Sequence, residues 1–83
     1  MADIQVSVSV EPEVQSLCDG LVKECQDLKS KQPTATLLGD AMPILLAVAG
    51  SYQALSADVK SAEALAYLGL SLGKVAAIFL GDV

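Results

Sequence analysis

The chain has 83 residues, of which 53% are hydrophobic and 18% are charged, and ten acids against five bases give a formal net charge of −5. This length fits a single domain spanning residues 1–83, and the apolar, weakly charged composition excludes an intrinsically disordered chain. The negative charge excludes nucleic acid as the expected partner, because a general nucleic-acid binder needs a basic surface.

Several residue types that are common in catalytic and metal-binding sites are missing from the sequence. The sequence has no His, Arg, Asn or Trp, so neither a Ser–His–Asp nor a Cys–His arrangement can form within the chain. The commonest metal ligand is also missing. Lys74, alone in an apolar stretch, is the one candidate for a reactive lysine, but such a side chain more often marks the exposed side of a helix. We therefore expect no enzymatic activity, no cofactor and no metal ion.

Residues 1–10 form an N-terminal arm, and within it residues 3–10 alternate between apolar and polar side chains. This period of two predicts a β-strand whose apolar face carries Ile4, Val6, Val8 and Val10. No other segment repeats the pattern, so the strand would pair with a second copy or, by strand addition, with another protein. A frayed terminus is the alternative.

A first helix is predicted from about residue 12 to residue 31, with Pro12 at the start and lysines in the last turn. Cys18 and Cys25 belong to its apolar stripe, about 10 Å apart along a helix, which is too far for a disulfide. We interpret both cysteines as small core residues. Because the alternating arm does not resemble a signal peptide, we expect a reduced, cytoplasmic setting, with membrane association as the alternative.

The Pro-Thr-Ala-Thr stretch that follows ends the first helix. A second helix is predicted from about 41 to 55. Thr34 or Thr36 would cap a short turn, and Asp40 would be the N-cap of the second helix. The alternative is one longer helix that starts at Thr34 and is kinked at Pro43.

A third helix is predicted from about 62 to 80, with Ser56, Asp58 and Ser61 as candidate caps before it. Gly69 and Gly73 lie four residues apart and so share one face of this helix. Each glycine costs about 1 kcal/mol of helix stability relative to alanine. We therefore expect a close contact at these glycines that compensates for the cost.

Apolar residues are distributed unevenly along the chain. Residues 1–40 contain seven acids, three lysines and 16 apolar residues, whereas residues 41–83 contain three acids, two lysines and 28 apolar residues. A small three-helix domain cannot bury that much apolar surface by itself. The predicted fold is thus mainly α: a strand followed by a small helical bundle that oligomerisation completes.

From this surplus we predict a non-enzymatic, self-associating protein whose apolar helical hairpin, residues 41–80, packs against other copies or a protein partner. The expected partner is a second copy, giving a dimer or a larger homo-oligomer. The expected interface residues combine the arm with apolar and small residues of the hairpin: Ile4, Val6, Val8, Val10, Leu45, Leu46, Ala49, Gly50, Leu65, Leu68, Gly69, Leu72, Gly73, Ile78 and Phe79.

The alternative is a membrane-active hairpin, similar to a small holin or pore-forming protein. The uncharged stretch 41–57 has 17 residues, and the stretch 64–81 has 18 with Lys74 as its one charge. Both are shorter than the roughly 20 residues of a typical span. A lysine inside the bilayer is also costly. Burial against protein is therefore the favoured prediction.

Two short segments, Leu38-Gly39-Asp40-Ala41 and Gly50-Ser51-Tyr52-Gln53, resemble the core of R-body subunits. R-body subunits are small helical proteins that polymerise into ribbons. The resemblance needs a gap, and the glutamine-rich stretch expected after it is missing here. It implies a polymerising subunit as a further alternative, and it assigns no functional residues.

Overall fold

A computed structural model describes residues 11–80, in which three α-helices are joined by two connections. Helix α1 spans Pro12–Lys31, α2 spans Met42–Gln53 and α3 spans Ala62–Leu80, and a five-residue π-helix, η1, spans Leu37–Ala41 directly before α2. The mainly helical prediction is confirmed, and α1 and α3 have the predicted bounds. The second helix is shorter than predicted, and the arm with its predicted strand lies outside the described residues.

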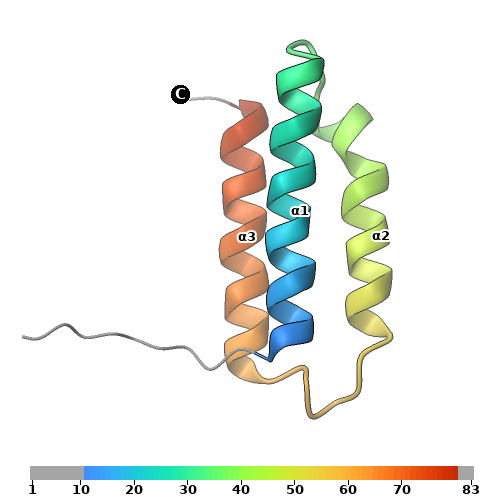
Figure 1. The fold of residues 1–83 in the computed structure, drawn as a ribbon, viewed down its shortest axis with the longest axis vertical. Coiled ribbons are helices and arrows are strands. Elements are labelled where there is room, and N and C mark those ends of the chain that lie inside the picture. Colours follow the sequence, from blue (N-terminus) through green and yellow to red (C-terminus); the bar gives the residue numbers. More distant parts are fainter. Residues whose placement is uncertain (1–10, 81–83) are drawn as a thin grey trace, which may run out of the picture.

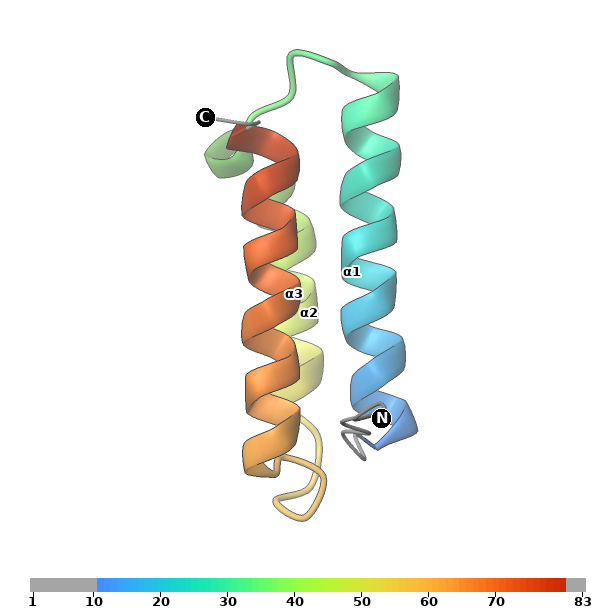
Figure 2. The ribbon, with the colours of Figure 1, turned by 90° about the vertical axis from the view of Figure 1, so that its left-hand side faces the viewer.

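Helix α1 is the element that organises the bundle. It packs against both α2 and α3, and it stands between them in Figure 1, with α1 and α3 running in one direction and α2 in the other. In the view turned by 90°, α2 and α3 overlap on one side while α1 stands on the other (Figure 2). Helices α2 and α3 therefore lie on the two flanks of α1, and they pack against α1 rather than against each other.

The position of α1 follows from its single apolar stripe. Val14, Cys18, Leu21 and Cys25 are buried, at spacings of four, three and four residues, which places them on one face of a helix. Proline at the first turn and lysines in the last turn match the ends of the helix, as predicted. One continuous buried stripe is what a helix needs in order to face two neighbours at once.

The start of α2 corrects one prediction. Asp40 is not an N-cap, because η1 runs directly into α2 and Asp40 lies inside η1. Thr36 caps η1 instead: its Oγ1 accepts a hydrogen bond from the Gly39 N–H at 3.0 Å, and the Asp40 carboxylate accepts one from the Thr36 N–H at 2.8 Å. A Cβ on Gly39 would lie 2.8 Å from Thr36 Oγ1, so a larger residue there would displace the hydroxyl that caps η1.

The observed start therefore resembles the alternative of a longer helix, except that it begins after Thr36 rather than at Thr34. At the other connection, Ser61 is the cap among the three predicted candidates, because its hydroxyl accepts a hydrogen bond from the Ala64 N–H at 3.1 Å. The ammonium of Lys60 donates to the Gln53 carbonyl at 3.1 Å and closes the turn between α2 and α3.

The core consists of two clusters on the α1 stripe. One contains the buried residues Leu21, Cys25, Ala41 and Val75, and the other contains Val14, Cys18 and Ala64. Helix α2 has no fully buried side chain of its own. It contributes half-buried residues at the edge of the core, and much of its surface remains outside the bundle.

Candidate interaction surface

The outer surface of α1 is polar. Lys23, Glu24, Gln26 and Asp27 are all exposed and lie in the middle of the helix. At its C-terminal end the Lys29 ammonium donates to the Ala35 carbonyl at 3.2 Å. The same ammonium lies 5.7 Å from the centre of the Phe79 ring of α3, a distance at which a cation is attracted to an aromatic face. This side of the bundle has the composition of an ordinary solvated surface.

The outer surfaces of α2 and α3 are apolar. Leu46 on α2 is 63% exposed, and Leu65 and Leu70 on α3 are 61% and 67% exposed. Between these leucines the exposed positions are mostly alanine and glycine, and Glu63 and Lys74 are the only charged residues of α3. We call the exposed residues of α2 and α3 the α2–α3 face.

Some of the predicted interface residues lie on this face and others do not. Those with exposed side chains are Leu46, Ala49, Gly50, Leu65, Gly69, Leu72 and Gly73. The remaining four of the hairpin are half-buried and pack against the chain's own core clusters, namely Leu45, Leu68, Ile78 and Phe79. The four arm residues Ile4, Val6, Val8 and Val10 lie outside the described residues.

Three strongly exposed leucines are missing from the predicted set. Leu38 in η1 is 80% exposed, and Leu70 and Leu80 on α3 are 67% and 62% exposed. The positions of Leu70 and Leu80 relative to Val75 indicate that both are exposed. Once Val75 is known to face inward, a residue five positions before or after it falls on the opposite side of the helix.

The glycines of the face have open space in front of them. A Cβ built on Gly50, Gly69 or Gly73 would meet no atom within 4 Å. The close contact expected at Gly69 and Gly73 is therefore not made within the described chain. The two glycines lower the stability of α3, and no packing contact within the described chain requires them.

The two cysteines are buried and free. Burial raises the pKa of both thiols, and for Cys18 the nearby Ser71 hydroxyl opposes this effect in part. A raised pKa leaves little thiolate at neutral pH, and the thiolate is the reactive form. Their location confirms the prediction of core residues and offers no reactive site.

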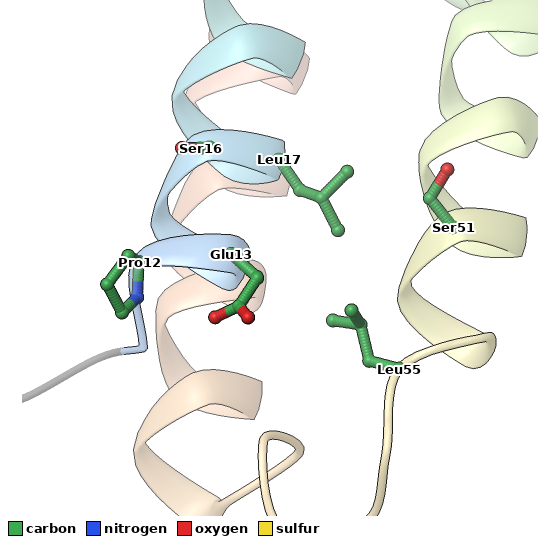
Figure 3. Close-up of a pocket in the computed structure, with 6 residues that line it drawn as sticks. All are labelled: Pro12, Glu13, Ser16, Leu17, Ser51 and Leu55. Atoms are coloured by element: carbon green, nitrogen blue, oxygen red, sulfur yellow. The ribbon is translucent and has the colours of Figure 1, made fainter.

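A hollow on the surface lies between the start of α1 and the end of α2 (Figure 3). Its volume is about 510 Å³, and it is lined by Pro12, Glu13, Ser16, Leu17, Ser51 and Leu55. Leu17 and Leu55 extend into the space between the two helices, as Figure 3 shows. The lining offers one carboxylate and two hydroxyl groups, and a serine without a neighbouring base is a weak nucleophile.

A polar contact ties α3 to the edge of α1. The Tyr67 hydroxyl donates a hydrogen bond of 2.6 Å to the Asp19 carboxylate. This bond raises the pKa of Tyr67, because it stabilises the neutral phenol beside a negative charge. The contact lies beside the buried face of α3, which Ala64, Ser71 and Val75 form, and it agrees with the rotation that this face gives the helix.

Helix α3 is also the one helix among the described residues that is long and apolar enough to cross a membrane, judged by length and composition alone. It has 19 residues and a mean hydropathy of 1.5 in its most apolar window, of which only 17% is buried in the bundle. A helix of this hydropathy inside a soluble protein is normally a core helix. Here most of it faces outward.

Comparison with known proteins finds no family model, curated protein or solved structure that matches this chain. The resemblance to R-body subunits therefore depends only on the two short segments quoted above. Arguments about function have to start from the surfaces of the chain itself.

Proposed function

We propose that this protein is a non-enzymatic assembly subunit that associates with copies of itself through the α2–α3 face. The observation that carries the proposal is the contrast between the two sides of the bundle. The outer side of α1 is charged, whereas the α2–α3 face exposes leucine, alanine and glycine over two helices. Exposed apolar surface of this extent marks an interface in soluble proteins.

The size of the face supports a stable contact. At about 1.5 Å per residue and a width of about 10 Å, the 19 residues of α3 and the 12 residues of α2 together present a projected area on the order of 500 Å². Stable interfaces bury about 800 Å² of accessible surface on each partner. The projected area leaves out the relief of the side chains, so the accessible area of the two outer helix surfaces is larger than this figure.

A second copy is the partner that best fits this surface. The α2–α3 face has few charged groups with which to select a different protein, and discrimination between partners depends largely on such groups. Pairing with a copy covers the apolar face of both chains at once, and it leaves the charged α1 surfaces outward. A closed symmetric pair gives a dimer, whereas an open repeat of the contact gives a filament.

The proposal is tested by placing one charge on the face. Ala66→Glu introduces a carboxylate at an exposed position on α3, where it stays solvated in the monomer and would be buried in the assembly. We expect light scattering after size exclusion to give an oligomeric mass for the unaltered chain and a monomeric mass for the variant. The matched control is Gln26→Glu on α1, which should leave the mass unchanged. Equal masses for Ala66→Glu and the unaltered chain would overturn the proposal.

A second candidate function is membrane association, and the observation in its favour is the hydropathy and exposure of α3. Uncharged phosphatidylcholine vesicles provide the test, because they offer an apolar layer without electrostatic attraction. Flotation of the detergent-free protein with these vesicles would favour the membrane candidate over self-association. Recovery of the chain in the vesicle-free fraction would exclude it.

A further inference from the structure

The outer face of α3 carries a seven-residue repeat of small side chains. At alternating spacings of four and three residues it presents the exposed Ala62, Ala66, Gly69 and Gly73, and the half-buried Ala76 and the exposed Leu80 continue the spacing. This spacing is that of the core positions of a coiled coil. Small residues at such positions allow two helix backbones to approach closely, and each glycine has free space in front of it.

Four residues beside the repeat form two matched pairs, whereas the exposed Leu70 has no counterpart. Leu65 and Leu72 flank it on one side, and Glu63 and Lys74 flank it on the other. The midpoint of the leucine pair falls between Leu68 and Gly69, and so does the midpoint of the charged pair. A two-fold axis at this point would therefore bring Leu65 onto Leu72 of the other copy and Glu63 onto Lys74 of the other copy, twice each.

The small residues match the same axis. Ala62 pairs with Gly73, and Ala66 pairs with Gly69, about a midpoint one residue earlier in the helix. This displacement is expected, because long side chains lean toward the N-terminus of their own helix and cover a point about one residue before their own Cα. In an antiparallel pair of helices, the midpoint between two long residues whose side chains meet therefore lies about one residue later in the sequence than the midpoint between two small residues that meet.

We infer that two copies pair through α3 in antiparallel orientation, with Ala62 opposite Gly73 and Glu63 opposite Lys74 of the other copy. The inference rests on the proposed self-association and specifies its geometry. A parallel pair would turn the flank with Glu63 and Lys74 toward the leucine flank of the other copy, so that neither charge meets an opposite one. The charge pattern of α3 thus selects one of the two orientations.

Cysteine cross-linking tests the register. In the antiparallel pair, Ala62→Cys in one chain lies opposite Gly73→Cys in the other. In a dimer of a single variant, the two new cysteines are displaced from each other by 11 residues, about 16 Å along the helices. A disulfide needs Cα atoms about 4.4–6.8 Å apart. We expect a linked dimer from the mixture of the two variants and none from either variant alone.

The unaltered chain is the negative control for the cross-linking. Its two cysteines, Cys18 and Cys25, are buried, so it should give no linked dimer. A linked dimer from either variant alone would mean parallel pairing and would overturn the inference. Because the Gly73→Cys side chain enters a close contact, a second measurement on different residues accompanies the cross-linking.

That second measurement exchanges the charges. Glu63→Lys and Lys74→Glu each convert two attractive contacts into repulsive ones, and we expect each to weaken the dimer about tenfold. The double variant restores opposite charges and should recover the affinity to within about threefold. Glu24→Lys and Lys23→Glu on the exposed side of α1 make the same changes of net charge and should have no effect.

The two proposals can fail separately. A monomeric unaltered chain would remove the self-association and the pairing together. A dimer that gives neither the mixed cross-link nor the recovery in the double variant would leave the proposed function in place and overturn the antiparallel α3 pair.

Discussion

Helices α1 and α3 are nearly equal in length, with 20 and 19 residues, and each contributes a narrow buried stripe to the same core. They differ on the other side. The outward residues of α1 include Lys23 and Asp27, whereas those of α3 include Ala66 and Leu70. The buried stripes account for the fold, so the difference between the outer faces has to be explained by something other than folding.

The largest effect is expected where α1 faces inward. Leu21 is 1% exposed and belongs to the cluster with Cys25 and Val75. Leu21→Ala leaves a cavity there and should lower the free energy of unfolding by about 2–5 kcal/mol, measured by urea denaturation at a dilution at which the chain is monomeric. The matched variant Leu70→Ala, on the exposed side of α3, should cost no more than about 0.5 kcal/mol. Similar losses at the two positions would show that the inner and outer faces are assigned wrongly.

Glycine replacement separates folding from association. Gly69→Ala and Gly73→Ala should each raise the free energy of unfolding of the monomer by about 0.5–1 kcal/mol, because the added Cβ meets no atom within 4 Å. Both should weaken association, since the methyl groups hold the two helices apart.

The control for the glycine variants is Gly20→Ala on α1, where the space is equally open. It should bring the same gain in stability with no change in association. If Gly69→Ala stabilised the monomer and left the oligomer as strong as before, the close approach of α3 to its copy would be excluded.

An effect on stability no larger than that of the glycine variants is expected at the hydrogen bond between α1 and α3. Tyr67→Phe removes the hydrogen bond to Asp19 and should cost about 0.5–1 kcal/mol at neutral pH. The bond raises the pKa of Tyr67 in the folded state, so its contribution is complete below the ordinary tyrosine pKa of about 10 and is lost as the pH rises through the folded-state value. The stability difference between the unaltered chain and Tyr67→Phe should accordingly shrink in alkaline solution.

Tyr52→Phe, at the other tyrosine, is the control for this pH dependence. A difference between the unaltered chain and Tyr67→Phe that stays constant from pH 7 to about pH 11 would contradict the assignment of the bond.

The helices were predictable where one face of the sequence is apolar. The three-and-four spacing of Val14, Cys18, Leu21 and Cys25 predicted α1 together with its buried stripe. The start of α2 was not predictable in the same way. In a capping box the acidic residue follows the capping residue by three positions, whereas Asp40 in η1 follows Thr36 by four. Asp40 was therefore interpreted as an N-cap of the second helix.

The exposed side of α3 was only partly predictable, because apolar residues occur all round this helix and periodicity alone does not distinguish its inner face. Leu68 and Phe79 were expected at the interface and are half-buried in the bundle, whereas Leu70 and Leu80 were not in the predicted set and are exposed. The rotation of α3 agrees with contacts between residues far apart in the sequence, such as Tyr67 with Asp19. Such contacts leave no local pattern.

The mass of the unaltered chain in detergent-free solution tests the central claim most directly. Light scattering coupled to size exclusion, at concentrations on the order of tens of micromolar, should give at least twice the 8.5 kDa of one chain. A soluble species of 8.5 kDa across that range would contradict the claim that the α2–α3 face is covered by a second copy.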